Sequence, residues 1–434
     1  MSGFRGWAAP EALAPITATV VLPGSKSETN RALVLAALSS GPSAITGGLE
    51  ARDTQLMRDA LRTLGVDIVE RDSEWRVTPP RGFVAGGVID CGLAGTVMRF
   101  VPPIAALAHG TVRFDGDKQA YARPMAPLLG ALKRLGARVD GNGHSLPFNL
   151  TGNPQLPGGD IIVDASESSQ FLSGLLLAGA RYTDGVDIQH IGNEIPSRTH
   201  VQMTLAMLRA RGVEIDDTRH HRWVVSPGPI QPVDVKIEPD LSNAAPFLAA
   251  AAITGGTVTV ANWPSTTIQP GDAIREILEH FGAEVTLEGS NLRVQGTDHI
   301  YGVDLDLSDA AELTPVVAAV AALADDTSHL RGIGHIRGHE TDRLAALETE
   351  LDRLGSHVNQ TDDGLTIHPR LLGGDLWRTY ADHRMAQAGA LLGLLVPEIV
   401  LDDIGCTGKT MPEFEELWTK MINDSVQESG EAIS

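Results

Sequence analysis

Lysine, arginine and serine side chains stand directly before the apolar stretches of this chain. The first stretch follows GSKSETNR, which contains Lys26, Ser27 and Arg31, and the second follows GLAGT, which contains Gly95. If these stretches are helices, their first residues present free backbone N–H groups and a partial positive charge. Such a helix start binds anions, and a glycine there lets a ligand approach the backbone closely. These positions therefore suit the binding of phosphate or carboxylate groups.

The third and sixth apolar stretches begin in the same way, after SESSQ and ADHR. The residues concerned are Ser168, Ser169, Gln170, Asp382, His383 and Arg384. A serine before a helix is by itself an ordinary cap. Cations, however, recur beside Gly, Ser and Thr in a chain of formal net charge −21, namely Lys26, Arg31, Arg123, Arg343, Arg384 and Lys409. The set as a whole predicts a site for a small ligand with several negative charges.

Three other motifs are weaker indications of chemistry. GSKSETNR resembles the end of a phosphate loop, but the full GxxxxGK[ST] pattern is absent, so nucleotide hydrolysis is not expected. His335, His339 and Glu340 stand in the order HxxxHE rather than HExxH, and we expect no metal site. His220 and His221 lie in a polar turn and are expected at the surface.

A repeated unit must position these residues. An Ala- and Leu-rich stretch occurs six times, with a period of roughly 70 residues. Its copies begin at Asn30, Met98, Gln170, Asn243, Leu313 and Met385. Each copy is apolar on nearly all sides, which predicts helices buried within clusters of units. A second, amphipathic helix recurs beside the first and ends at a glycine before a strand.

The position of the Pro-rich stretch SPGPIQP suggests how the units are grouped. It occupies residues 226–232, close to mid-chain, and is expected to link two globes of three units each. If the repeats share a fold, the helix starts converge on a cleft between the two globes. The glycines that end the second helices are Gly65, Gly136, Gly212, Gly282 and Gly355.

Composition and charge exclude several classes of protein. Acidic residues outnumber Lys and Arg by 55 to 34 and aromatic residues are 4%, which argues against a nucleic-acid binder with a basic surface. The two cysteines, Cys91 and Cys406, exclude a disulfide framework and a Cys-rich zinc site, and Cys91 is expected to be a core thiol. No apolar run reaches the about 18–20 residues of a membrane span, and residues 1–10 lack a signal-peptide pattern. We therefore expect a cytoplasmic protein with no membrane partner.

Seven motifs occur in a fixed order along the chain. They are LPGSKSETNRAL, GLAGTVMR, the ARP at residues 122–124, SSQFL, HETDRL, DHRMA and CTGKTMPEF. This set resembles the 5-enolpyruvylshikimate-3-phosphate (EPSP) synthase family, most of all its actinobacterial branch, over nearly the whole chain. The resemblance implies the α/β enolpyruvyl transferase fold, an inside-out α/β barrel with two domains of three βαβαββ repeats each. We place one globe at residues 1–18 and 234–424, the other at 19–233, and a flexible tail at 425–434.

The resemblance also implies a reaction and its ligands. The enolpyruvyl group of phosphoenolpyruvate is transferred to the 5-hydroxyl of shikimate 3-phosphate, and phosphate is released, in the shikimate pathway to chorismate and the aromatic amino acids. The implied enzyme is a cytoplasmic monomer that needs no cofactor or metal and is a glyphosate target. Implied phosphoenolpyruvate contacts are Lys26, Gly95, Arg123, Gln170, Arg343, Arg384 and Lys409. Implied shikimate 3-phosphate contacts are Lys26, Ser27, Arg31, Ser168, Ser169, Gln170, Ser197, Glu312 and His339.

Matching positions further imply that Glu312, Glu340 and Lys26 are catalytic. Two carboxylates suit the two proton transfers, because the 5-hydroxyl needs a base and the methylene carbon of phosphoenolpyruvate needs a proton donor. Lys26 and Arg384 are implied to neutralise the departing phosphate. Glu312 stands where Asp is usual, so Asp309 is the alternative candidate for that role.

Other departures from the family pattern are Leu93 in place of Asn, His339 where Lys is common, and His200 where Tyr is frequent. One alternative is the enolpyruvyl transferase that acts on UDP-N-acetylglucosamine. That enzyme typically has GAKN where this chain has Gly24–Ser27, and a catalytic Cys in a loop that here, at residues 117–123, has none. The other alternative is a non-catalytic, anion-binding regulatory relative, which would have lost the carboxylates or Lys26.

Overall fold

The computed structural model describes residues 6–431, with side chains through residue 426, and divides into two compact units. Unit 1 takes the chain up to Pro23 and from Pro239 onward, and unit 2 takes Gly24–Glu238. Each unit has a hydrophobic core of its own. The chain therefore crosses between the units twice.

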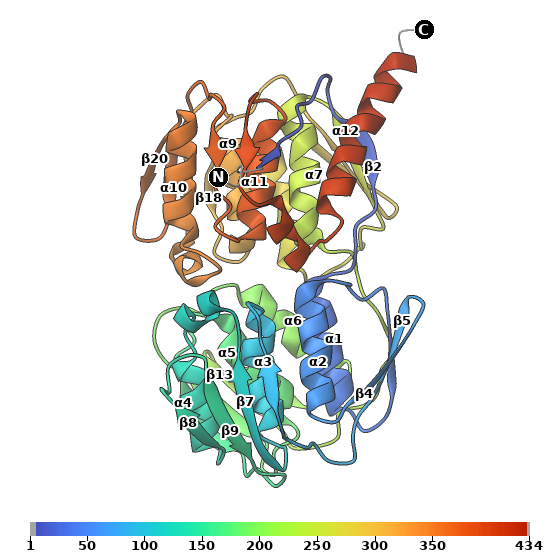
Figure 1. The fold of residues 1–434 in the computed structure, drawn as a ribbon, viewed down its shortest axis with the longest axis vertical. Helices are drawn as coiled ribbons and strands as arrows, with labels where there is room; N and C mark the ends of the chain where they lie inside the picture. Colours follow the sequence, from blue (N-terminus) through green and yellow to red (C-terminus); the bar gives the residue numbers. More distant parts are fainter. Residues whose placement is uncertain (1–5, 432–434) are drawn as a thin grey trace, which may run out of the picture. The chain divides into compact units, whose positions relative to one another are not determined.

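Unit 2 contains three four-stranded sheets of one topology (Figure 1). The first has the order β14 (Val235–Lys236), β3 (Ser43–Thr46), β5 (Glu74–Thr78), β4 (Asp67–Arg71). The second has the order β6 (Val88–Asp90), β7 (Gly110–Asp115), β9 (Phe148–Gly152), β8 (Arg138–Gly141). The third has the order β10 (Gly159–Val163), β11 (Val186–His190), β13 (Arg222–Val225), β12 (Ile215–Asp216). The first two strands of each sheet are parallel, and the others pair antiparallel.

Unit 1 repeats this topology twice and then varies it. One sheet has the order β2 (Thr17–Val20), β15 (Thr257–Ala261), β17 (Asn291–Gln295), β16 (Glu284–Glu288). The next has the order β18 (Asp304–Asp306), β19 (Ser328–Arg331), β21 (Leu365–His368), β20 (His357–Gln360). The last has three strands, β22 (Leu376–Trp377), β23 (Val400–Leu401) and β1 (Trp7–Ala8). Here β1 pairs antiparallel with β23, in the place that a hairpin takes in the other five sheets.

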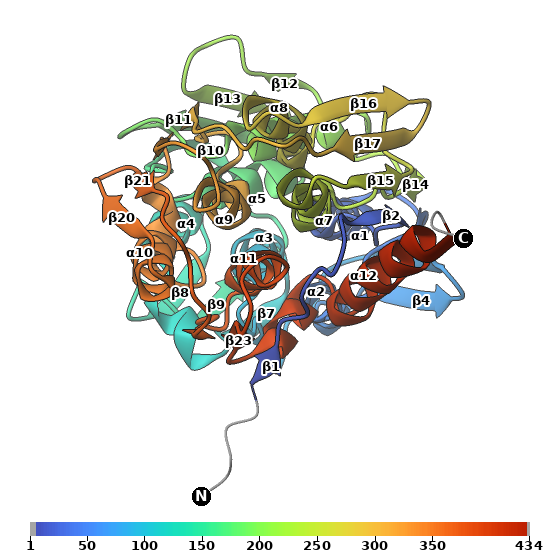
Figure 2. The ribbon, with the colours of Figure 1, turned by 90° about the horizontal axis from the view of Figure 1, so that it is seen from above.

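A buried helix precedes the second strand of each sheet. These helices are α1 (Lys26–Leu38), α3 (Gly95–Ala105), α5 (Ser169–Gly179), α7 (Leu241–Thr254), α9 (Thr314–Ala321) and α11 (His383–Gly393). Four of these helices, α3, α5, α9 and α11, directly connect two parallel neighbouring strands, whereas α1 and α7 follow the crossings between the units. Figure 2 shows α7, α9 and α11 packed together at the centre of unit 1, inside its sheets. An Ala- and Leu-rich helix that is apolar all round has no face for solvent, which explains this position. The prediction of buried helices and of the α/β fold class is confirmed.

The second helix of each repeat has exposed as well as buried residues. These helices are α2 (Arg52–Thr63), α4 (Ala126–Arg134), α6 (Arg198–Arg209), α8 (Ile274–His280), α10 (Arg343–Leu354) and α12 (Phe414–Glu431). The glycines predicted to end five of them all have a left-handed φ, between 74° and 110°. A glycine adopts this conformation without steric cost, so the chain can turn directly into the following strand.

The structure places the crossings between units later than the sequence suggested. The expected boundary at 18/19 would divide β2, which pairs in full with β15 of unit 1. The expected boundary at 233/234 would assign β14 to the wrong unit, because β14 pairs with β3 of unit 2. The Pro-rich stretch 226–232 is not the link either. It lies within unit 2, where Gln231 N donates to Arg211 O at 2.9 Å.

The expected flexible tail at 425–434 is also wrong over its first part. α12 continues to Glu431, and Ser425 is 1% exposed. The Ser425 hydroxyl accepts from Thr17 N at 2.9 Å, which ties α12 to β2. Residues 432–434 lie outside the described part of the chain.

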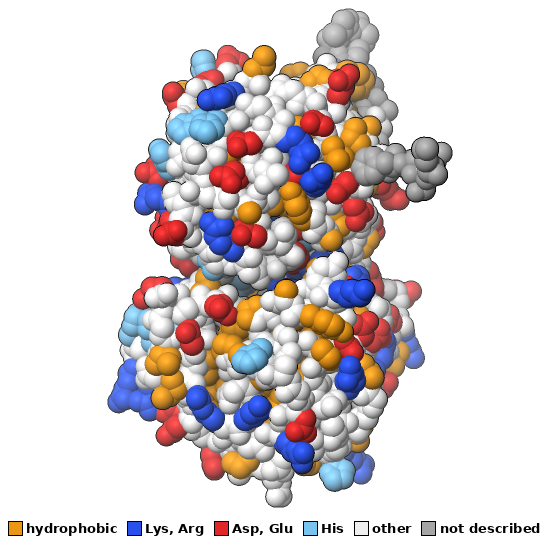
Figure 3. Space-filling model, turned by 60° about the vertical axis from the view of Figure 1, so that its left-hand side comes forward, with side chains coloured by type: hydrophobic (Ala, Val, Ile, Leu, Met, Phe, Trp, Pro, Cys, Tyr) orange, Lys and Arg blue, Asp and Glu red, His pale blue; other side chains and the backbone are white. Residues whose placement is uncertain are grey.

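No helix between residues 6 and 431 is long and apolar enough to cross a membrane. On the face drawn in Figure 3, acidic and basic side chains are interspersed rather than gathered by sign.

Candidate active site

Lys26 lies at the start of α1, where the sequence predicted an anion site. Ser25 caps this helix by accepting from Glu28 N at 3.4 Å. Lys26 Nζ is 3.4 Å from Asp53 Oδ2, and the Asp53 side chain, on α2, is 2% exposed against 21% for Lys26. A buried carboxylate therefore holds the ammonium group at the helix start while leaving part of it accessible.

Arg31 lies one turn further along α1 and is buried. Its Nε donates to Thr204 Oγ1 at 2.8 Å, and its two terminal nitrogens donate to the carbonyl oxygens of Ser27 and His200 at 3.0 and 3.1 Å. The guanidinium carbon lies 5.1 Å from the ring centre of Phe100. Among the described residues no carboxylate pairs with Arg31, and burial lowers its pKa to about 9. A buried cation without an acidic partner favours an anionic ligand.

Gly95, Arg123 and Gln170 meet at the start of α3. A Cβ atom added to Gly95 would lie 2.9 Å from Arg123 Nη2 and 2.9 Å from Gln170 Oε1. It would also lie 3.1 Å from Arg99 Nη1. Arg123 Nη1 donates to the carbonyl oxygen of Leu93 at 2.9 Å, whereas Gln170 Oε1 is buried with no hydrogen-bond partner in the part of the chain that the structure describes. Three polar side chains thus surround a backbone position that only glycine leaves open.

The expected serine contacts sit at two further helix starts. Ser168 caps α5 by accepting from Gln170 N at 3.3 Å, and Ser169 is the buried first residue of that helix. Ser197 precedes α6 with φ 51° and ψ 54°, and its hydroxyl makes no capping bond to the helix. A left-handed conformation outside glycine costs about 1–3 kcal/mol and persists only where the surrounding structure imposes it.

In unit 1, Arg343 joins two carboxylates and an imidazole. Its Nε and Nη2 donate to the two oxygens of Asp382 at 2.8 and 3.1 Å, and Nη2 also donates to Glu340 Oε2 at 3.1 Å. Its Nη1 lies 3.2 Å from His339 Nδ1. Because a guanidinium only donates, His339 Nδ1 accepts and the ring carries its proton on Nε2. Burial disfavours the charge of Arg343, but Asp382 and Glu340 outweigh it and raise the Arg343 pKa.

Lys409 adds a second cation to Glu340. Its ammonium forms a short ion pair with Glu340 Oε1, and both side chains are at most 9% exposed. Lys409 belongs to the short 3₁₀ helix Ile404–Lys409, which packs against α11. Glu340 is therefore held between two cations from two different elements.

Glu312 lies in the short 3₁₀ helix Ala311–Leu313, just before α9. It accepts a hydrogen bond from Ser242 Oγ at 3.2 Å, and Arg384 Nη1 donates to the carbonyl oxygen of the same serine at 2.6 Å. Burial raises the pKa of Glu312, and the charges of Arg384 and Arg343 together with the Ser242 hydrogen bond oppose the rise. Asp309, the alternative candidate, is exposed.

The expected residues divide into two sets, one in each unit. Unit 2 holds Lys26, Ser27, Arg31, Gly95, Arg123, Ser168, Ser169, Gln170 and Ser197. Unit 1 holds Glu312, His339, Glu340, Arg343, Arg384 and Lys409. The first set offers cations, hydroxyls and helix starts suited to anion binding, and the second adds two carboxylates that can exchange protons.

Sequence reasoning missed several residues that hold these sets in place. Asp53 and Ser242 were not singled out, and Asp382 was noted only as part of a helix start. Asp382 caps α11 by accepting from Arg384 N at 2.9 Å, but its pairing with Arg343 spans 39 residues of sequence. A buried Asp or Ser looks like any helix cap until the partner is known.

His335, from the HxxxHE motif, also belongs to the unit 1 set. Its Nε2 is buried with no hydrogen-bond partner among residues 6–431, and its ring centre lies 5.9 Å from that of His339. Burial lowers the His335 pKa to about 4, so the ring is neutral near pH 7.

Cys91 is fully buried, and burial raises its thiol pKa, in agreement with an inert core residue.

Comparison with known proteins agrees with the motifs. Residues 10–418 match the EPSP synthase (3-phosphoshikimate 1-carboxyvinyltransferase) family. A 3-phosphoshikimate 1-carboxyvinyltransferase of Mycobacterium ulcerans (strain Agy99) is 53% identical over 431 residues, covering 98% of this chain and 100% of that relative.

Two solved structures share the fold. EPSP synthase from Acinetobacter baumannii has a TM-score of 0.79 at 24% identity, covering 96% of this chain and 97% of that one. The enolpyruvyl transferase NikO from Streptomyces tendae has a TM-score of 0.72 at 18% identity, covering 95% and 96%. The ordered motifs, the family match and the full-length relative together establish that this chain belongs to the EPSP synthase family.

Proposed function

We propose that this chain transfers the enolpyruvyl group of phosphoenolpyruvate to the 5-hydroxyl of shikimate 3-phosphate, giving EPSP and phosphate. The observation that carries the proposal is its membership of the EPSP synthase family over residues 10–418. Both substrates carry several negative charges, which suits a chain whose buried cations gather at helix starts despite a net charge of −21.

Shikimate 3-phosphate is bound mainly by unit 2 in this proposal. Ser27, Arg31, Ser168, Ser169, Gln170 and Ser197 supply its contacts there, together with Lys26. Buried Arg31 supports this role, because its charge has no carboxylate partner among the described side chains. Glu312 and His339 of unit 1 complete the contacts.

Phosphoenolpyruvate is bound in this proposal by residues of both units, most of them cationic. Lys26, Gly95, Arg123 and Gln170 contribute from unit 2, and Arg343, Arg384 and Lys409 from unit 1. The absent Cβ of Gly95 leaves its backbone open beside Arg123 and Gln170. Glyphosate would occupy the same position.

Chemistry needs two proton transfers before the phosphate leaves. Protonating the methylene carbon of phosphoenolpyruvate leaves positive charge on its neighbour, which the 5-hydroxyl oxygen attacks as it loses its proton. The resulting tetrahedral intermediate breaks its carbon–oxygen bond to phosphate and loses a methyl proton, which restores the double bond. Glu312 and Glu340 carry these protons, and Lys26 and Arg384 neutralise the departing phosphate. The proposal includes a cytoplasmic monomer that uses no cofactor.

A phosphate-release assay tests the reaction. Phosphate should appear from phosphoenolpyruvate only when shikimate 3-phosphate is present. Release that depends on UDP-N-acetylglucosamine instead would favour the related transferase, and no release with either acceptor would favour a binding protein.

The role of Glu312 is tested by a pair of variants. We expect Glu312→Gln to lower kcat by about 10²–10⁴-fold with little change in KM, because Gln keeps the shape but cannot transfer the proton. Asp309→Asn, which alters an exposed carboxylate three residues earlier, is the matched control and should keep near-normal activity. The opposite pattern would move the role to Asp309.

A further inference from the structure

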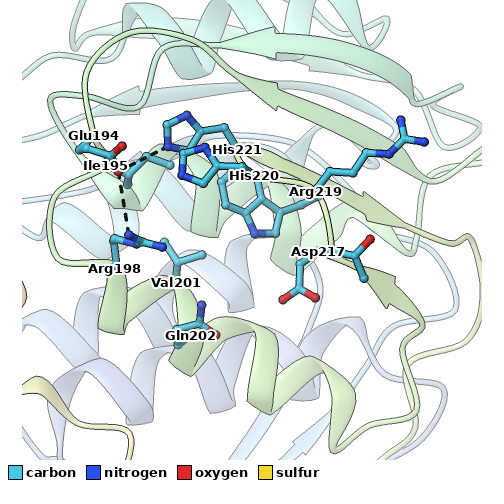
Figure 4. Close-up of a pocket in the computed structure, with 11 residues that line it drawn as sticks. Glu194, Ile195, Arg198, Val201, Gln202, Asp217, Arg219, His220 and His221 are labelled. Atoms are coloured by element: carbon cyan, nitrogen blue, oxygen red, sulfur yellow. Dashed lines mark hydrogen bonds and ion pairs between the residues drawn. The ribbon is translucent and has the colours of Figure 1, made fainter.

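A second cluster of titratable side chains lies in unit 2, outside both sets of site residues. Glu194 is in the connection from β11 to α6, and His220 and His221 form the turn between β12 and β13. One potential ligand atom of each residue lies within 4.8 Å of the others. Figure 4 shows the two imidazole rings beside the Glu194 carboxylate, at a pocket of about 280 Å³ that Gln202 and Asp217 also line.

The backbone holds both segments of this cluster at the end of β11. His190 N, at the last residue of that strand, donates to the His221 carbonyl oxygen at 2.8 Å. The His190 ring packs edge-on against the His221 ring, with centres 4.8 Å apart. His190 Nε2 lies 2.7 Å from the Asn193 carbonyl oxygen, next to Glu194. The cluster is therefore built on a strand end rather than on two independent loops.

The His220 and His221 rings lie against each other, and His221 lies beside the Glu194 carboxylate. His221 has a φ of 58°, a left-handed conformation that a non-glycine residue adopts only when its surroundings impose it. Its Nε2 is 3.4 Å from Glu194 Oε2, and the His220 ring stacks on it at 3.7 Å between centres. One nitrogen of each imidazole and one Glu194 oxygen thus lie within 4.8 Å of one another.

Two imidazoles and one carboxylate form a donor set that suits Zn²⁺ and similar ions and does not suit Ca²⁺ or Mg²⁺, which prefer oxygen ligands. In a tetrahedral zinc site with ligands at about 2.0–2.1 Å, the ligand atoms are roughly 3.4 Å apart. Glu194 and His220 are exposed, so rotation of these two side chains, with the His220 ring leaving its stack on His221, can bring the ligand atoms to that distance. We propose that Glu194, His220 and His221 bind one divalent transition-metal ion, with water completing the coordination.

Arg198 competes with the metal for the carboxylate. Its Nη1 lies 4.0 Å from Glu194 Oε2, and Figure 4 shows this contact together with the one from His221. A cation so close to a ligand oxygen weakens metal binding. Removing it should therefore have the opposite effect to removing a ligand.

Calorimetric titration of the full-length protein with ZnCl₂ tests the proposal. The expected result is one site per chain, and bound Zn²⁺ should raise the melting temperature because it joins two segments of the folded state. The double variant His220→Asn, His221→Asn should weaken binding by at least about tenfold, since even outer-shell changes at metal sites cost about 10–100-fold. Arg198→Gln should strengthen binding. Co²⁺ should give visible absorption bands that the double variant lacks.

Two control variants separate this site from general binding by surface histidine. His299 forms another exposed histidine–carboxylate pair, 3.2 Å from Asp325, and His357 lies beside His368 with ring centres 5.5 Å apart. His299→Asn and His357→Asn should leave the affinity unchanged. Equal binding by the wild type and the double variant, or an equal loss in a control, would overturn the proposal. So would an Arg198→Gln variant that binds no more tightly than the wild type.

Discussion

At the scale of single residues, the contact between Ser242 and Glu312 is one of several that oppose the effect of burial on the Glu312 pKa. Burial raises the Glu312 pKa, and the Ser242 hydrogen bond lowers it again because it favours the ionised form. Ser242→Ala should therefore shift to higher pH the limb of the kcat/KM profile that reports Glu312. That limb should be absent in Glu312→Gln. A profile of Ser242→Ala that coincides with the wild type would remove Ser242 from this role.

Single charged residues could be predicted from the sequence, but their partners could not. The ordered motifs predicted Lys26, Arg31 and Arg343 as site residues, because charged residues within such motifs can be recognised from the sequence alone. These motifs gave no indication that Arg31 lacks an acidic partner among the described side chains while Arg343 has two, since such pairing depends on the folded structure. Sequence reasoning also treated His220 and His221 as simple surface residues, although the fold sets both beside Glu194.

At the scale of elements, the start of α11 combines a helix cap with a buried ion pair. Asp382 accepts from Arg384 N and binds Arg343 through both oxygens, with a side chain that is fully buried. Asp382→Asn keeps a capping side chain but removes the charge opposite Arg343, so it should cost about 3–5 kcal/mol of unfolding free energy.

Asp342→Asn is the matched control for this change. Asp342 caps α10 in the same way, accepting from Ala345 N at 3.1 Å, but its side chain is 42% exposed and its ion pair with Arg337 lies near the surface. Asn caps about as well as Asp, and exposed ion pairs contribute about 0–1 kcal/mol. Chemical denaturation of both variants should separate the two costs, and equal losses would contradict a special role for the buried pair.

The C-terminal helix gives a second prediction at this scale. Ser425 accepts from Thr17 N and lies 3.1 Å from Thr17 O, so its hydroxyl joins α12 to the first residue of β2. Ser425→Ala should cost about 1–3 kcal/mol, because it leaves a partly buried backbone N–H without a partner. Thr19→Ala, at an exposed position of the same strand, should change the melting temperature far less. A Ser425→Ala variant as stable as the wild type would show that the contact between Ser425 and Thr17 does not stabilise the fold, as expected of a flexible tail.

The repeated helices were predicted well from the sequence. The short strands at the ends of the sheets were not, and this difference has a physical reason. Apolar helices and terminal glycines recur by local chemistry, so their period is visible. The placement of β2 in unit 1 and of β14 in unit 2 depends on which sheet edge each short strand joins, and two to four residues carry too little pattern to indicate that. For the same reason β1, two residues long, gave no indication that it completes the last sheet.

At the scale of the whole molecule, the two crossings make unit 2 a continuous segment, Gly24–Glu238, inserted into unit 1. Its two ends are tied to each other. Ser25 N donates to the Glu238 carbonyl oxygen at 2.7 Å, and Glu238 N donates to Glu28 Oε2 at 2.9 Å. Since unit 2 also has its own core, its fold depends on contacts within the segment itself.

Residues 24–238 expressed alone should therefore unfold in one cooperative thermal transition. The fragment should retain weak binding of shikimate 3-phosphate, seen as a rise in melting temperature with ligand, because Arg31 and the serine contacts of the proposal belong to this segment. Arg31→Ala in the fragment should abolish that rise, whereas Lys133→Ala, an exposed lysine on α4, should not. The fragment should release no phosphate from phosphoenolpyruvate, since Glu312 and Glu340 are in unit 1.

A fragment that melts without cooperativity would show that unit 2 needs unit 1 to fold. One that folds but gains nothing from the ligand would show that the shikimate 3-phosphate contacts do not reside in unit 2.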